Sequence, residues 1–119
     1  VLGYAFKILS VSFVTTTIGA GAAASQVLNL EIGTTNLTAG ILTITLAGTD
    51  TLGELTPATA ITAANAGTST DAISIEVAAG GTVFTAGEGI LLIKVENRDA
   101  SNAFASLASA TNDLITALS

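Results

Sequence analysis

Short runs of alternating apolar and polar residues recur along the chain, and Gly, Asn and Asp separate them. Alternation with a period of two is typical of a strand that has one face covered. This pattern predicts strands at residues 9–13, 27–32, 41–46, 60–64, 72–77, 82–85 and 90–95. Residues 90–95 form an almost continuous apolar run, which indicates a strand that is covered on both faces.

Turn-forming residues lie between the predicted strands. We expect turns at residues 33–36, 48–50, 65–67 and 80–81, and an irregular stretch around Pro57. About seven short strands at roughly ten-residue spacing indicate an all-β protein, an antiparallel β-sandwich of jelly-roll or immunoglobulin-like type. Residues 101–118 are compatible with either a short amphipathic helix or a last strand.

Residues 1–24 form an apolar arm that differs from the β-patterned body, residues 25–119. One Lys, an apolar stretch and an Ala-rich end at residues 22–24 are close to the layout of a secretory signal peptide. The alternation at residues 9–13 and the β-branched run at residues 15–17 favour an extended strand instead. We therefore expect the arm to be a strand of the mature protein. A transmembrane helix needs about 20 consecutive apolar residues, and the Ser, Thr and Gly content makes it a poor alternative.

The composition argues against an enzyme. The chain contains no His, Cys, Met or Trp, and these types include most of the side chains that carry out chemistry near neutral pH. A carboxylate-based hydrolase would need two acidic residues brought together in a cleft, and no acidic pair stands out by its spacing. We therefore expect no catalytic residues, no cofactor and no small-molecule substrate.

The charge content favours assembly over nucleic-acid binding. Half of the residues are apolar and only 10% are charged, whereas about 25% are charged in an ordinary soluble domain. A domain of this size buries about two thirds of its unfolded surface, so another copy of the chain is the simplest cover for the rest. The net charge is −6, and the three basic residues, Lys7, Lys94 and Arg98, are scattered. Nucleic acid is not an expected partner, because it requires clustered Lys and Arg.

A few residues are candidates for modification or ion binding. Asn36 begins the single Asn-X-Ser/Thr sequon and could carry a glycan on a secreted protein. Asp50 with Glu54, or Glu96 with Asp99, could offer oxygens to a cation such as Ca²⁺. Neither pair has the ligand density of a calcium loop, so we expect solvated carboxylates and no metal site.

Two parts of the chain resemble the TasA/camelysin family of biofilm fibre proteins. Residues 36–46, NLTAGILTITL, are similar to the family's TAG segment and the hydrophobic strand that follows it. Residues 55–57, 65–68 and 72–77 are similar to the family's order of a Pro turn, a strand, an Asn-X-Gly turn and a second strand. The chain lacks the Tyr/Phe-Ser-Asp signature found near the start of the bacterial members. The resemblance therefore points to distant members such as the archaeal bundling pilins.

The resemblance implies a structural subunit, or pilin, of an extracellular filament at the cell surface, with a role in biofilm formation or cell–cell adhesion. In such a filament the N-terminal arm completes the sheet of the next subunit, which is donor-strand complementation. The implied partners are further copies in a helical homopolymer, and neighbouring filaments. Physical arguments support the same role, because about 18 extended residues reach roughly 60 Å. A donated strand also satisfies an exposed sheet edge.

The donated strand would bury the large apolar side chains of the arm. The predicted polymerisation residues are Phe6, Ile8, Leu9, Val11, Phe13, Val14 and Ile18. Leu9, Val11 and Phe13 are expected to fill a groove whose walls come from residues 41–46 and 90–95. Burying about six such side chains would contribute on the order of 10 kcal/mol before ordering costs.

Three other arrangements remain open. The arm could be an ordinary first strand of its own sheet. It could be a helix in the core of a type IV-like pilus, where helix packing tolerates Ser, Thr and Gly. The chain could also be a capsid or surface-layer coat protein. The secondary structure and the pairing partner of the arm distinguish the first two from donor-strand complementation.

Overall fold

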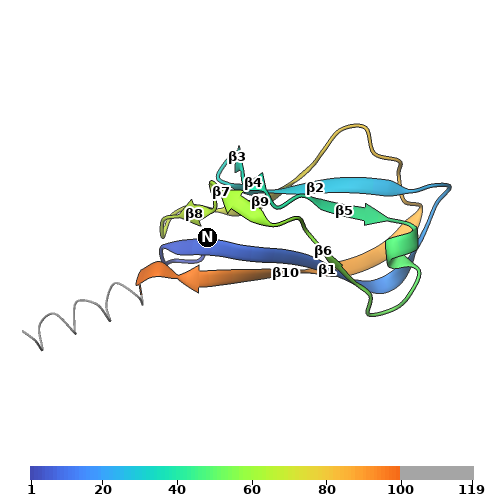
Figure 1. Cartoon of the computed structure of the whole chain (residues 1–119), viewed down its shortest axis with the longest axis horizontal. Coiled ribbons are helices and arrows are strands. Elements are labelled where there is room, and N and C mark those ends of the chain that lie inside the picture. The colour runs from blue at the N-terminus through green and yellow to red at the C-terminus, as the bar shows by residue number, and fades with distance from the viewer. Residues whose placement is uncertain (100–119) are drawn as a thin grey trace, which may run out of the picture.

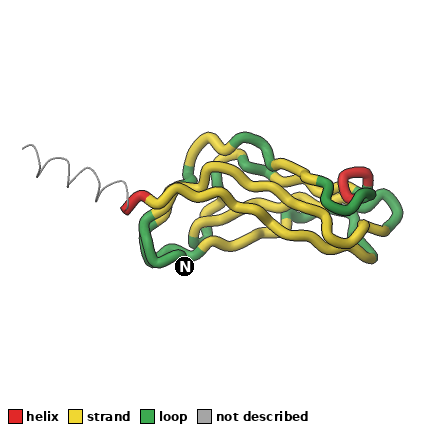
Figure 2. The backbone as a smooth tube through the Cα atoms, turned by 90° about the horizontal axis from the view of Figure 1, so that it is seen from below, coloured by secondary structure: helices red, strands yellow, loops and turns green. Residues whose placement is uncertain are grey.

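The computed structural model of the chain describes residues 1–99. This part of the chain forms two four-stranded antiparallel sheets and a two-stranded antiparallel sheet. The two larger sheets lie face to face, with their strands along the long axis of the molecule (Figures 1 and 2). The prediction of an all-β antiparallel sandwich is therefore confirmed. Residues 101–118, predicted as a helix or a last strand, lie outside the described residues.

The first sheet is built around the N-terminal arm. Its central strand is β1 (Phe6–Ala20), which pairs with β10 (Ala86–Asn97) along one edge. Two short strands, β6 (Leu55–Pro57) and β8 (Ala66–Gly67), pair with the other edge of β1. The arm is thus a strand, as expected, and in this structure it lies in the middle of its own chain's sheet.

The second sheet is built around β2 (Ser25–Ile32), which follows β1. One edge of β2 pairs with β9 (Ile73–Val77). The other edge pairs with β5 (Leu42–Thr45) and β3 (Thr35–Asn36). Alternation of apolar and polar residues predicted β2, β5 and β9 correctly, because each has one face toward the core.

Further elements close one side of the sandwich. Strands β4 (Thr38–Ala39) and β7 (Ile61–Ala63) pair with each other and join the β3/β5 side of one sheet to the β6/β8 side of the other. A short 3-10 helix, η1 (Ala47–Thr49), connects β5 to the segment before β6. Strands β5 and β6 are also in contact across the two layers. Strands β9 and β10 are the edge strands of their sheets on the opposite side of the sandwich, which we call the open side.

The core between the sheets is centred on the first half of β1. Its fully buried cluster consists of Phe6, Ile8 and Val11 from β1, Leu30 from β2 and Leu37. Side chains from β10 pack against this cluster at partial exposure, namely Leu91, Ile93 and Val95. The arm thus contributes the largest share of the side chains that hold the two sheets together.

Two strand predictions need correction. Residues 82–85 form no strand, because Thr82 makes only an isolated bridge to Ser25. Strand β10 is not covered on both faces, since Ile90 and Leu92 are 55% and 52% exposed. These side chains lie on the face that points away from the core, and no layer among residues 1–99 packs over them.

Several predicted turns are partly strands. Gly33 and Thr34 do form a turn, but the next two residues belong to β3. Residues 66 and 67 form β8, and Pro57 is the last residue of β6 instead of an irregular position. These strands have two or three residues each, so their periodicity is too short to be recognised without a partner.

The N-terminus and the end of β10 lie at the same end of the sandwich (Figure 1). The backbone N–H of Arg98 donates to the carbonyl oxygen of Ala5 at 2.8 Å. The N–H of Ala5 donates to the carboxylate of Asp99 at 3.2 Å. Among residues 1–99 no helix has the length and apolarity needed to cross a membrane.

Candidate functional site

The candidate assembly site is the slot that β1 occupies between β10 and the short strands β6 and β8. Pairing with β10 runs from Phe6 opposite Asn97 to Ala20 opposite Ala86, with three irregularities in register. These pairs extend over the whole of β1, so β10 forms a complete wall of the slot. Residues 90–95, expected to be a groove wall, belong to this strand.

The opposite wall of the slot is discontinuous and comes from residues between η1 and β8. Ile8 donates its N–H to the carbonyl of Asn65 at 2.8 Å, and the side-chain amide of Asn65 donates to the carbonyl of Ile8 at 2.6 Å. Ala58 donates to the carbonyl of Val11 at 2.9 Å, and Thr15 donates to that of Glu54 at 3.0 Å. Both backbone edges of β1 are therefore hydrogen-bonded, as in an inserted strand. Residues 41–46, the other expected wall, contain β5, which lies in the facing sheet and is not paired with β1.

The seven predicted polymerisation residues fall into three groups. Phe6, Ile8 and Val11 are at most 2% exposed. Phe13 and Val14 are partly buried. Leu9 and Ile18 are 42% and 48% exposed. Phe6, Ile8 and Val11 therefore belong to the core of their own chain, whereas Leu9 and Ile18 lie on its surface.

The expectation that Leu9, Val11 and Phe13 share one face is wrong. The register passes from Ile8 opposite Val95 to Ser10 opposite Lys94, so Leu9 is an extra residue in β1. Such a β-bulge reverses the alternation that follows it. Leu9 consequently points outward, while Val11 points into the core.

A short connection joins β1 to the rest of the chain. Only residues 21–24 separate β1 from β2. Gly21 has φ 133° and Ala23 has φ 52°, and the left-handed conformation of Ala23 is unfavourable for a residue with a Cβ atom. The connection thus stores strain when β1 and β2 belong to the same chain.

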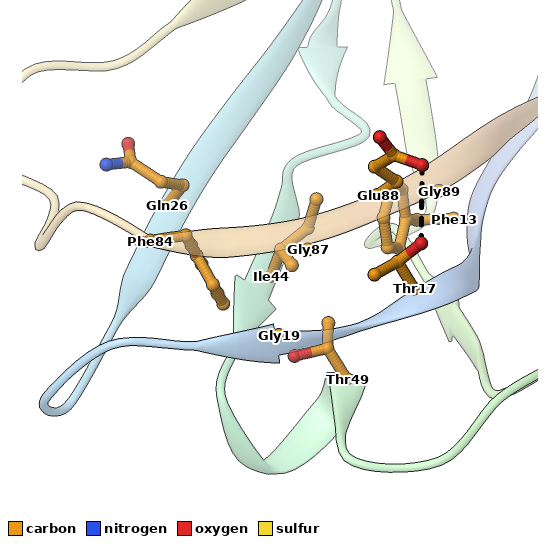
Figure 3. A pocket seen from close by; sticks show the side chains of 10 residues that line it. All are labelled: Phe13, Thr17, Gly19, Gln26, Ile44, Thr49, Phe84, Gly87, Glu88 and Gly89. Atoms are coloured by element: carbon orange, nitrogen blue, oxygen red, sulfur yellow. Dashed lines mark hydrogen bonds between the residues drawn. The ribbon is translucent and has the colours of Figure 1, made fainter.

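A cavity of about 220 Å³ opens between the sheets at the end near the β1–β2 connection. Figure 3 shows its lining, which comes from both sheets, from η1 and from the segment before β10. Most of the lining is apolar, including Phe13, Ile44 and Phe84. Thr17 donates a hydrogen bond to Glu88 at 3.2 Å at its rim. The lining contains a single carboxylate, and the volume is below the roughly 300 Å³ at which small-ligand pockets begin.

The predicted modification and ion sites are separate from the slot. Asn36 is exposed in β3, where its side-chain amide donates to the carboxylate of Glu76 at 2.9 Å. Asp50 accepts a hydrogen bond from Thr51 at 3.1 Å. Residues 1–99 contain no group of three or more acidic side chains placed to hold a metal ion.

The open side of the sandwich carries residues that sequence reasoning did not single out. Ile75 and Val77 in β9 are 47% and 60% exposed. Ile75 pairs with Leu30, which is 1% exposed, so this face of β9 points toward the interior. Alternation in the sequence identified the apolar face of β9, but only the structure shows that the face is partly uncovered.

No protein-family model, curated protein or solved structure matches this chain. The resemblance to the TasA/camelysin family therefore stays a prediction.

Proposed function

We propose that the chain is a structural subunit, or pilin, of an extracellular homopolymer and that copies exchange β1, so that each β1 fills the slot of the next copy. The observation that carries the proposal is the place of β1, which is the first strand of the described residues, lies in the middle of its sheet and is joined to β2 by residues 21–24 alone. A strand with one short connection to its sandwich can be replaced by the same strand of another copy. The exchanged arrangement keeps every pairing and burial that the closed chain has.

An empty slot would have a high free energy, so a β1 strand, from the same copy or another, is expected to fill it. Emptying it would expose Phe6, Ile8 and Val11, each contributing about 1.5–3 kcal/mol on burial, and would leave both walls without hydrogen-bonding partners. A copy whose own β1 has left therefore has a strong tendency to accept another. The strained conformation of Ala23 is needed only while β1 and β2 pack in the same copy.

Strand exchange of this kind is heterologous and head-to-tail. The donor surface is β1 and the acceptor surface is the slot, so each added copy presents a new free end. Such contacts produce rings or open filaments. The strand conformation of β1 also favours this mode over a pilus built on an N-terminal helix. A filament subunit needs no catalytic group, which agrees with the sparse chemistry of the chain.

The decisive experiment uses a disulfide across β1 and β10. Ser12 lies opposite Leu92 in the register, both side chains lie on the outward face, and the chain has no native Cys. In the Ser12→Cys/Leu92→Cys variant, oxidation of dilute monomer locks β1 in its own sheet. We expect this locked form not to polymerise and the reduced form to polymerise normally, as seen by electron microscopy.

Oxidation after assembly gives the complementary readout. If β1 is exchanged, residues 12 and 92 that face each other belong to different copies, so denaturing electrophoresis shows a covalent ladder. The Ser12→Cys variant alone is the matched control and should run as monomer. Polymers that form from locked chains, or that yield only monomer bands after oxidation, would refute strand exchange.

A further inference from the structure

Strand β10 has a free edge. It pairs with β1 along one edge, and no strand among residues 1–99 pairs with the other. Arg98 donates to Ala5 on the β1 side, and alternate residues of a strand direct their N–H and C=O groups to the same edge. Val95, Ile93 and Leu91 therefore direct theirs to the free edge. A long unpaired edge is a template for another strand.

The side chains beside this edge are apolar and exposed. Ile90 and Leu92 are 55% and 52% exposed on the outer face of β10. Ile75 and Val77 of β9, on the same side of the sandwich, are partly uncovered as well. Natural edges are usually protected by Pro, by bulges or by inward charges, and β10 (AGEGILLIKVEN) contains no Pro and no register irregularity of its own.

We propose that this edge binds the β10 edge of a second copy in an antiparallel, twofold-symmetric pair centred on Leu91. In this register Ile90 lies opposite Leu92 of the second copy, and Glu88 lies opposite Lys94 of the second copy. Symmetry repeats both pairs, giving two apolar contacts and two ion pairs on one face. On the other face, Ile93 lies opposite Gly89 of the second copy, where the ring of Phe13 covers the glycine.

The neighbouring registers are worse matched. A pair centred on Leu92 places Glu88 opposite Glu96 of the second copy, which is repulsive. A pair centred on Ile93 places Ile90 opposite Glu96 and Leu92 opposite Lys94. A pair centred between two neighbouring residues would place outward-facing side chains of one copy opposite inward-facing side chains of the other. Charge and apolar complementarity therefore select the register centred on Leu91 and a second copy as the occupant.

This contact is isologous and closed, so it differs from strand exchange and does not depend on it. It joins two copies, or two filaments side by side, through the same surface on each. Strand exchange uses the slot and leaves the free edge of β10 unchanged. The two contacts can therefore coexist.

Cysteine cross-linking tests the register directly. In the Glu88→Cys/Lys94→Cys variant each new Cys faces its counterpart in the second copy, within the 4.4–6.8 Å Cα separation of disulfides. We expect covalent dimers on oxidation, and none from Glu88→Cys or Lys94→Cys alone. Exchanged strands are not covalent and separate in denaturant, so the result is independent of the proposed function. A double variant that stays monomeric after oxidation would overturn the proposal.

Charge reversal provides the second readout. Lys94→Glu turns two attractive pairs into two repulsive ones, and we expect the pairing constant, measured by sedimentation, to weaken about tenfold. Adding Glu88→Lys to this variant restores opposite charges and should restore pairing. Glu96→Lys is the matched control, because position 96 faces Ala86 of the second copy. Stronger pairing of the Glu96→Lys variant would instead favour the register centred on Leu92. A pairing constant that Lys94→Glu leaves unchanged would also overturn the proposal.

Discussion

The ring of Phe6 lies directly against the backbone of Gly67, where the start of β1 pairs with β8. A Cβ atom at residue 67 would overlap the tip of that ring, and Phe6 itself is fully buried. Gly67 is not one of the glycines with a positive φ. A glycine is therefore needed here for space and not for backbone conformation. The pair forms a socket that receives the first buried side chain of β1.

We therefore expect Gly67→Ala to weaken the docking of β1. The added methyl group would displace the Phe6 ring and lower the free energy of unfolding by about 1–3 kcal/mol. If β1 is exchanged, the same socket serves both arrangements, so monomer and polymer should lose stability together. Denaturant titration of both forms measures this. Ala66→Ser, on the exposed neighbour in β8, is the control, and an equal loss there would contradict the socket.

Thr15 carries a polar group that the core does not satisfy. It is 1% exposed, and its hydroxyl has no hydrogen-bonding partner among the described residues. Replacing a buried unpaired hydroxyl by a methyl group of similar shape removes a desolvation cost. We expect Thr15→Val to raise the free energy of unfolding by about 1 kcal/mol. Thr16→Val, at the exposed neighbour in β1, should change it little, and a destabilised Thr15→Val would show that the hydroxyl is paired.

Sequence reasoning predicted strands where one side chain in two is buried. The alternation of residues 27–32 and 72–77 survives in β2 and β9, because both strands have regular pairing on the face that meets the core. The arm was also recognised as extended. Only Leu9 was assigned to the wrong face, because a bulge is a property of two paired strands and leaves no mark in the alternation of one.

The features that define the candidate site are harder to predict from the sequence. The exposure of Ile90 and Leu92 depends on the absence of a layer over β10 within residues 1–99, which an apolar run does not reveal. The short strands β6 and β8 exist because β1 pairs with them. In the sequence, Gly67 and Gly89 indicate turns or weak strands. In the structure, the backbone of each glycine lies against an aromatic ring. Partner strands, not local propensity, determine all of these features.

Asp71 makes stability depend on pH. Its carboxylate accepts hydrogen bonds from the backbone N–H of Thr68 at 2.8 Å and from the Thr68 hydroxyl at 3.0 Å. These bonds favour the charged form and hold the pKa of Asp71 below its ordinary value. The stabilisation is therefore fully present above the unfolded pKa of about 3.9 and is lost as the pH falls through the lower pKa of the folded state.

We expect Asp71→Asn to lower the denaturant midpoint of unfolding at pH 7. Near pH 2 the midpoints of the variant and the parent protein should approach each other. Thr68→Val removes the hydroxyl donor and keeps the N–H, so its effect at pH 7 should be intermediate. Denaturant titrations across this pH range measure the difference. A difference that stays constant with pH would show that the carboxylate charge is not responsible.

The β1–β2 connection offers a way to shift the balance between the closed chain and the polymer. Ala23 adopts φ 52°, which costs an L-residue with a Cβ about 1–2 kcal/mol and costs Gly little. Ala23→Gly should stabilise the closed chain, whose turn needs this conformation. The exchanged form, in which residues 21–24 extend toward another copy, gains nothing. We expect the threshold concentration for polymerisation to rise about fivefold for about 1 kcal/mol.

Ala23→Pro should act in the opposite direction, because proline fixes φ near −65° and cannot adopt the closed turn. Its threshold concentration should fall, and polymer should form at the expense of monomer. Ala64→Gly is the matched control, since Ala64 has a similar φ of 55° in the turn between β7 and β8. That turn stays within one copy in both arrangements, so the substitution should stabilise both and leave the threshold unchanged. Equal shifts for Ala23→Gly and Ala64→Gly would mean that the β1–β2 connection does not open during assembly.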